Sequence, residues 1–462
     1  MAQEQTDLAM IKDSQRLRQE CHYFKLKMVQ NYFSCIALLV PLLPIPIYLP
    51  KLCNDLDSLL ATTIAYLAGS VPCTHVELTG LSYTRKELAN ACRLEAKRKF
   101  EECLFEQDPA PETCGALLLM AVSSIYDFRG KEARIYASLC WNMINQIDPI
   151  EPKTEQDEIQ EQIRVRVFYL SRYVEYIFLQ SKDDSHCHAH ATAHIDVSPK
   201  PLASELAHKT YRDSLSCFQF LTRIMAVSRY GSDHEATMFS FFGGRLNTIS
   251  SESIVNLEHV LLEIWKALPS ELRIGRGPFE YMGPQVLDQY ACNKGFSLRV
   301  NAAYYVYWLS LQTKIMQRPS ESFPAYGYRM DADRALMISS ICADAATKIY
   351  SVMEEVSPCM FEIRWLATTM DILRLLSESP VPDIKSKAKE NIAVLSKIIR
   401  NQLEIVQHGV GRRNSCSSLE SEESKWTQDT DASSRTTYIT PIFTHMKGLL
   451  RDYMIDNDII QG

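Results

Sequence analysis

Apolar residues recur at intervals of three and four along most of this chain, which is the spacing of residues that share one face of an α-helix. Residues 112–149 give the clearest case. One face of the first half carries Leu117, Met120, Ala121, Ser124, Ile125 and Phe128, and one face of the second half carries Ala133, Tyr136, Ala137, Cys140, Trp141 and Ile144. A turn at residues 127–130 separates the halves, so the stretch predicts a helical hairpin in which Trp141 is the bulkiest packing residue.

The same spacing predicts helices through the rest of the chain. They cover residues 55–67, 81–106, 164–173, 254–268, 298–319, 341–349, 361–376 and 388–407. An acidic stretch at residues 151–161 comes before the helix that begins at Arg164. We therefore expect an all-α fold: a large domain of many helices packed in layers, with no significant sheet.

Changes in composition divide the chain into four segments. Residues 1–24 are polar and charged, and residues 25–410 form the predicted all-α domain. Residues 411–437 are rich in serine and threonine and poor in hydrophobic side chains, so we expect a disordered linker. Residues 438–462 mix acidic and apolar side chains. That mixture fits either a short C-terminal helix docked on the domain or an activation-like segment that folds on a coactivator.

The most apolar run, residues 35–50, carries Pro41, Pro44, Pro46 and Pro50. A membrane-spanning helix needs about 20 apolar residues with an intact hydrogen-bond ladder, and each proline removes a donor. We expect this run to be a buried, extended loop, and we expect no membrane partner.

Length and charge limit the kinds of protein that this chain can be. With 462 residues, of which 46% are hydrophobic, it can bury a sizeable core. The net charge of −7 argues against a folded body that binds nucleic acid over its whole surface. A basic cluster at residues 93–99 is interleaved with glutamates, which predicts a solvated, salt-bridged helix face.

The 14 cysteines form no C-x-x-C pair, and most of them lie in apolar helical stripes. We expect Cys92, Cys103, Cys114, Cys140, Cys292 and Cys342 to pack as small hydrophobic residues in a reducing compartment. The polar N-terminus lacks the apolar core of a secretory signal, which also indicates a protein inside the cell.

One short stretch has the composition of a metal site. His186, Cys187, His188, His190 and His194 lie within nine residues. Structural zinc, however, needs four ligands held as a tetrahedron, and neither helical nor strand spacing is present here. We expect an exposed loop and no metal ligand in this chain.

An all-α enzyme of the isoprenoid cyclase type would need paired acidic motifs for magnesium. Asp183 and Asp184 offer a start, but Cys187 stands where a third carboxylate is needed. The second motif begins at Asn247 and Ser251 and then reaches Val255 in place of a carboxylate. No spacing suggests a nucleophile, a base and an orienting group, so we expect no catalytic residue and no enzyme.

Five stretches carry a resemblance to a known family. Residues 116–144 are a leucine-rich helix, a glycine-containing turn and a helix with Trp141. Residues 164–173 combine Arg164 and Arg166 with aromatic residues, which indicate core packing in preference to a surface for a partner. In residues 254–273 a helix with Trp265 stops at Pro269, because proline cannot continue the ladder. Residues 298–319 end in Arg318-Pro319, and residues 341–349 read ICADAATKI.

In this order the five stretches resemble the fungal-specific transcription factor regulatory domain, also called the middle homology region. The chain departs from that pattern where Tyr169 replaces a tryptophan, where Tyr176 lies close to the place of an aspartate-arginine pair, and where Gln317 replaces a histidine before Arg318. The resemblance implies a nuclear regulator of transcription that works through effector binding, self-association or coactivator contact, although a cytoplasmic location stays open. It also implies coregulators as partners and a homodimer or heterodimer partner.

The family binds DNA through a zinc binuclear cluster of six cysteines N-terminal to this domain. Only Cys21 and Cys35 occur in the first 52 residues, so no position here inherits a zinc or DNA role. We expect no cofactor in this chain and DNA contact only through a missing or partner-supplied domain. The alternatives are an all-α isoprenoid-type enzyme and a cluster-less helical scaffold or inhibitory partner.

The aromatic helix at residues 304–308 suggests two roles. Tyr304, Tyr305 and Trp308 could line an effector pocket, or they could be core residues. Because aromatic residues surround this helix, we favour the core for at least some of them.

Overall fold

The structure is a computed structural model. It describes residues 2–71, 73, 76–103, 109–127, 129–180, 199–225, 251–287, 295–316, 321–323, 328–356 and 363–408. Over these residues the protein is all-α and built from helices in layers, as the sequence predicts. One hydrophobic cluster runs from Phe24 to Ile399 through both halves of the body.

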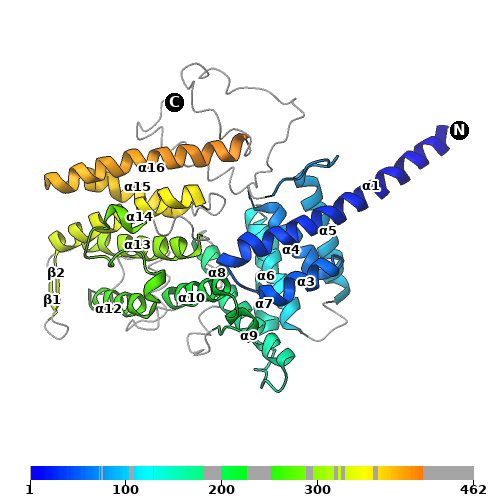
Figure 1. The fold of residues 1–462 in the computed structure, drawn as a ribbon, viewed down its shortest axis with the longest axis horizontal. Helices are drawn as coiled ribbons and strands as arrows, with labels where there is room; N and C mark the ends of the chain where they lie inside the picture. The colour runs from blue at the N-terminus through cyan, green and yellow to red at the C-terminus, as the bar shows by residue number, and fades with distance from the viewer. Residues whose placement is uncertain are drawn as a thin grey trace, which may run out of the picture.

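The first half of the chain forms one side of the body, on the right in Figure 1. Its elements are α1 (Ala2–Asn31), a π-helical turn (Tyr32–Ile36), α2 (Ala37–Leu39), α3 (Ile45–Asn54), α4 (Leu59–Ser70), α5 (Arg85–Cys103), α6 (Pro111–Tyr126), α7 (Gly130–Ile144) and α8 (Glu155–Gln180). Helix α1 runs unbroken across the boundary that we place between residues 24 and 25, and its first turns project beyond the other helices.

The second half forms the opposite side. Its elements are α9 (Ala203–Leu206), α10 (Lys209–Met225), α12 (Ser251–Ala267), the 3₁₀ turns Ser270–Leu272 and Pro284–Val286, α13 (Phe296–Ile315), β1 (Glu321–Phe323), β2 (Tyr328–Met330), α14 (Ala332–Val356), α15 (Ile363–Ser377) and α16 (Pro382–His408). The two three-residue strands pair antiparallel, with Glu321 opposite Met330. No other strand occurs among the described residues.

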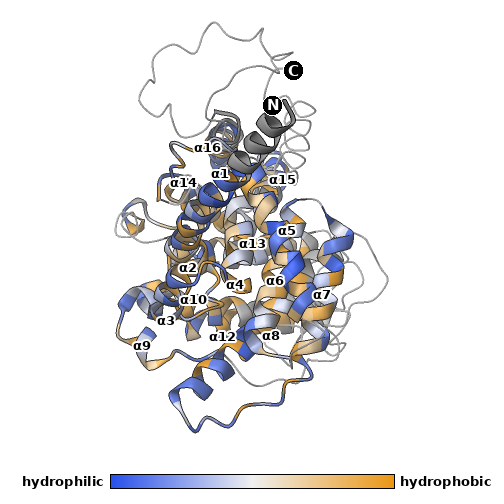
Figure 2. Ribbon diagram, turned by 90° about the vertical axis from the view of Figure 1, so that its right-hand side faces the viewer, coloured by the Kyte–Doolittle hydropathy of each residue, from blue (hydrophilic) through white to orange (hydrophobic). Residues whose placement is uncertain are grey.

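The predicted hairpin is confirmed as α6 and α7. Leu117 and Met120 of α6 are fully buried, and α6 packs against α4, α7 and α8. Trp141 of α7 is 6% exposed, and its ring lies 5.3 Å from that of Phe168 on α8. In Figure 2, α5 and α7 carry hydrophilic as well as hydrophobic residues. No residue of α6 is exposed. The hairpin is thus held on both sides by core packing.

The prediction of an extended loop over residues 35–50 is wrong for most of that run. The chain leaves α2 and forms α3 from Ile45, with only residues 40–44 outside a helix. Pro46 lies in the first turn of α3, where its missing N–H is not needed. Pro50 lies inside the helix, where it removes one ladder bond. Burial of Ile45, Tyr48 and Leu52 offsets that loss.

The helix that we expected to begin at Arg164 begins at Glu155 instead. Thr154 and Asp157 cap it reciprocally: the Thr154 N–H donates to the Asp157 carboxylate at 2.9 Å, and the Asp157 N–H donates to the Thr154 hydroxyl at 3.1 Å. Glu155 and Glu158 add negative charge to the first turn, which the helix dipole favours. The acidic stretch is therefore the start of α8.

Two predictions about polar and sulfur side chains are confirmed where the structure describes them. Cys92, Cys114, Cys140 and Cys342 are buried as free thiols, whereas Cys103 is half-buried and Cys292 lies outside the described residues. On α5, Lys99 pairs with Glu95, Arg98 with Glu102, and Arg93 with Glu132 of α7. No described helix is long and apolar enough to cross a membrane.

Candidate functional site

Four aromatic side chains meet where α12 packs on α13. This aromatic cluster consists of Trp265, Tyr304, Tyr305 and Trp308. The ring of Trp265 stacks on that of Tyr304, with 4.3 Å between centroids and 18° between planes. Tyr305 meets the same indole edge-on. Trp265 is 6% exposed and the other three are at most 1% exposed, so the cluster belongs to the core.

The segment after α12 is fixed onto this cluster by α13. Pro269 follows the end of α12 and leads into the 3₁₀ turn, as the sequence predicts. The Asn301 side chain donates to the Leu272 carbonyl and accepts from the Ile274 N–H, both at 2.9 Å. The Tyr305 hydroxyl donates to the Ile274 carbonyl at 2.8 Å.

Glycine is required directly after the segment that Asn301 and Tyr305 hold. Gly275 has φ +82°, and a Cβ there would lie 2.8 Å from the Tyr305 hydroxyl oxygen. A side chain at this position would therefore combine backbone strain with a clash against the hydroxyl that holds the segment.

A buried ionic group lies next to the aromatic cluster. Glu258 of α12 is 2% exposed, accepts a hydrogen bond from the Gln312 amide and forms an ion pair with Arg334 of α14 at 3.2 Å. The guanidinium of Arg334 also lies over the ring of Phe279, 5.6 Å from its centroid. Phe279 in turn contacts Trp308 edge-on at 5.7 Å. The charge of Glu258 is thus balanced, as burial requires.

Two polar atoms of the cluster have no hydrogen-bond partner within the described part of the chain: the Tyr304 hydroxyl and the Trp308 indole N–H. Burial raises the pKa of Tyr304 well above its usual value, an effect that nearby Trp308 partly offsets. Burial likewise raises the pKa of the neighbouring Cys342 thiol. All three groups stay protonated near neutral pH. The cluster can therefore offer a hydrogen bond to an acceptor, but it supplies neither a general base nor a thiolate nucleophile.

The predicted effector residues Tyr304, Tyr305 and Trp308 do lie together, and all three are core residues. Their effector role stays a prediction. The predictions from the sequence did not include Asn301, which holds the segment after α12, or Glu258, the buried carboxylate beside the aromatic cluster. A signal for Asn301 was present, because an amide inside an otherwise apolar helix needs a buried partner.

Arg166 is a second organising residue. It is fully buried and binds Glu205 of α9 through two hydrogen bonds, at 2.8 and 2.6 Å. Its guanidinium also donates to the carbonyls of Lys200 and Pro41. Arg164 instead pairs with Glu161 on its own helix at 2.6 Å. The core interpretation of this stretch is confirmed, whereas Arg318 and Pro319 lie outside the described residues.

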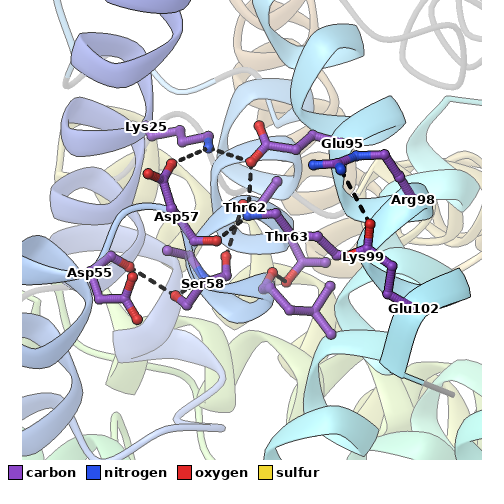
Figure 3. A network of polar contacts seen from close by, with 12 residues as sticks. Lys25, Asp55, Asp57, Ser58, Thr62, Thr63, Glu95, Arg98, Lys99 and Glu102 are labelled. Atoms are coloured by element: carbon purple, nitrogen blue, oxygen red, sulfur yellow. Dashed lines mark hydrogen bonds and ion pairs between the residues drawn. The ribbon is translucent and has the colours of Figure 1, made fainter. Parts of the chain in front are cut away.

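A third polar group joins α1, the start of α4 and α5, and is drawn in Figure 3. The Lys25 ammonium lies 2.8 Å from Glu95 and 3.3 Å from Asp57, and Lys99 lies 2.9 Å from Glu95. Burial alone would lower the pKa of Lys25, but the hydrogen bond and charge of Glu95 outweigh it and the pKa is raised. Burial tends to raise the pKa of Glu95, yet the two lysines lower it overall. A carboxylate with a lowered pKa is a poor proton acceptor. These ion pairs therefore stabilise the packing of α1, α4 and α5 and do not form a catalytic site.

No group of three or more histidine, cysteine, aspartate or glutamate side chains within the described ranges could hold a metal ion. The histidine-rich stretch with His186, Cys187, His188, His190 and His194 lies outside those ranges, as do Asp183, Asp184 and Asn247.

Fold and side-chain clusters together define an all-α protein whose organising polar and aromatic residues lie in its core. No protein-family model, no curated protein and no solved structure matches this chain.

Proposed function

We propose that this chain is the regulatory domain of a fungal-type transcription factor and acts by binding, not by catalysis. The proposal rests mainly on the order of the five stretches that resemble that family. Their described parts lie on α6 and α7, α8, α12, α13 and α14, and Trp141, Arg166 and Trp265 are buried in the core.

The positions that carry the resemblance also hold the helices together, which supports the proposal. Trp141 joins α7 to α8, Arg166 joins α8 to α9, and Trp265 joins α12 to α13. Residues with such contacts are tied to the architecture of a domain more than to one reaction. Five stretches in the family's order therefore support the resemblance more strongly than any single stretch does.

In this proposal the domain works in the nucleus with transcriptional coregulators and a homodimer or heterodimer partner. DNA contact comes from a zinc-cluster domain outside this chain or on a partner, and the zinc belongs to that domain. Tyr304, Tyr305 and Trp308 are at most 1% exposed, so an effector would contact them only if the helices around them moved apart.

The test is to fuse residues 1–462 to a heterologous DNA-binding domain and to measure a reporter with the matching site. We expect a several-fold change in transcription relative to the DNA-binding domain alone. Trp265→Ala should abolish the change, because it removes the stack on Tyr304. Ile135→Ala is the matched control, since Ile135 is 59% exposed.

A folded, nuclear fusion that leaves the reporter unchanged would contradict the proposal and favour a helical scaffold. Magnesium-dependent turnover of a prenyl diphosphate by the purified chain would replace it with the isoprenoid-type enzyme.

A further inference from the structure

One face of α16 carries a row of unbalanced positive charge. This basic row consists of Lys385, Lys389, Lys397 and Arg400, all of which are exposed. Helical periodicity places the four within about one third of the helix circumference and along about 22 Å of its axis. Helix α16 lies at the outer edge of the body, at the upper left of Figure 1.

The neighbouring charges do not neutralise the basic row. Lys387 is turned toward the body and pairs with Asp344 of α14 at 3.6 Å. The exposed carboxylates among the described side chains of α16 are Asp383 and Glu390, which lie outside the arc of the row. Within the described part of the chain, none of the four cations of the row forms an ion pair with a carboxylate.

Like charges also stand next to one another along the row. Lys385 and Lys389 are four residues apart, and Lys397 and Arg400 are three apart, which puts each pair one turn apart. Such pairs repel and destabilise a helix by a few tenths of a kcal/mol each. A row of this kind is therefore suited to an extended polyanion.

An acidic segment follows α16 in the same chain. Residues 420–431 contain Glu420, Glu422, Glu423, Asp429 and Asp431, with Lys425 as their one cation. This acidic segment lies outside the described residues. Glu420 follows His408, the last residue of α16, by twelve residues, and a chain of that length spans at most about 40 Å. The rise along α16 from Lys389 to His408 is about 29 Å, so the segment can reach the row.

We propose that the acidic segment, residues 420–431, docks on the basic row of α16. Each exposed ion pair contributes little by itself. Tethering, however, gives the segment a roughly millimolar effective concentration at the row, so several weak pairs act together. The docked segment covers the row and competes with any other polyanion for it. This goes beyond the proposed function and does not depend on it.

The experiment is zero-length coupling of carboxylates to lysine amines in the purified full chain, followed by peptide mass spectrometry. We expect products that join residues 420–431 to Lys385, Lys389 or Lys397 at about 50 mM salt. At about 500 mM salt their yield should fall several-fold, because exposed charges are then screened over a few ångströms.

Two variants with the same change in net charge separate the row from a general charge effect. Lys389→Glu/Lys397→Glu should lose the products. Lys97→Glu/Lys131→Glu, on exposed positions of α5 and α7, should keep them. Adding Glu422→Lys/Glu423→Lys to the first variant should restore coupling with the charges reversed.

Three results would overturn the proposal, each with the unfolding midpoint unchanged. The first is the absence of these products, and the second is equal yield in both variants. The third is coupling only between chains, seen when isotope-labelled and unlabelled copies are mixed. That result would mean that the acidic segment of a second copy binds the row. Binding of a DNA duplex through Lys389 and Lys397, measured by fluorescence anisotropy in a chain that gives no such products, would assign the row to nucleic acid instead.

Discussion

At the scale of single residues, Arg166 determines how the middle of the chain folds back on itself. A guanidinium with no exposed surface is stable only when its charge is paired and most of its donors are bonded. Both terminal nitrogens of Arg166 donate hydrogen bonds, and its Nε–H has no partner among the described residues. Glu205 supplies the paired charge, and the Lys200 and Pro41 carbonyls accept further bonds. The sequence indicated a core role for this stretch, but it could not name Glu205. The partner lies 39 positions away, and no local spacing connects the two.

We expect Arg166→Met to lower the free energy of unfolding by about 3–5 kcal/mol, because it leaves the Glu205 carboxylate buried and unpaired. Urea unfolding followed by circular dichroism measures the loss. Arg166→Met/Glu205→Leu should lose less, since no buried charge remains. Arg164→Met is the control. A loss of unfolding free energy there as large as that of Arg166→Met would show that the buried pair contributes no more to stability than a partly exposed one.

At the scale of elements, the sequence was most informative where one apolar stripe continues for several turns. Both arms of the α6–α7 hairpin meet that condition, so their positions followed from periodicity alone. The run at residues 35–50 does not, because its prolines are compatible with either an extended loop or a helix that starts beside one of them. Which of the two forms is decided by burial of Tyr48 and Leu52 against distant helices, and periodicity does not contain that information.

For the hairpin we expect Trp141→Ala to cost about 3–5 kcal/mol, as removal of a large buried side chain leaves a cavity beside Phe168. Ile135→Ala, on the exposed face of the same helix, should change stability by no more than about 0.5 kcal/mol. Chemical denaturation of both variants gives the comparison. Equal midpoints for Trp141→Ala and the wild type would show that packing of the hairpin is not central to the stability of the fold.

At the scale of the whole molecule, ion pairs and hydrogen bonds between distant segments join the helices around the core. Lys25 and Glu95 are 70 positions apart, and Tyr48 and Glu112 are 64 apart. Glu112 also accepts from Lys51 at 3.0 Å. Burial tends to raise the pKa of Glu112, but the hydrogen bonds from Tyr48 and Lys51 lower it overall. Such pairs depend on the finished packing, which explains why the sequence indicated charged helix faces but not their partners.

These pKa shifts set the pH range of highest stability. The lowered pKa values of Glu95 and Glu112 contribute stability above the usual glutamate pKa, and that stability is lost as pH falls through the folded values. The raised pKa of Lys25 contributes stability below the usual lysine pKa, which is lost as pH rises through the folded value. Burial also raises the pKa of the Cys92, Cys140 and Cys342 thiols, so stability begins to fall once these thiols ionise in the unfolded chain. We expect urea midpoints to be highest between about pH 5 and pH 8.

Glu95→Gln tests the acidic limb of that profile. The variant should be less stable than the wild type at pH 7, and the difference should shrink toward pH 3 as the wild-type carboxylate is protonated. A constant difference across that range would mean that Glu95 contributes through packing and not through charge.

The contacts of Arg166 also matter for protein engineering. Helix α8 ends at Gln180, and the chain rejoins it at Lys200, whose N–H donates to Gln162 and whose carbonyl accepts from Arg166. Both ends of the intervening stretch are therefore anchored on one helix by their own bonds. Lengthening a connection costs a free energy that grows only with the logarithm of its length. An affinity tag or fluorescent reporter inserted between residues 181 and 198 would thus add chain between two points that are each fixed on α8, at a free-energy cost that grows slowly with its length.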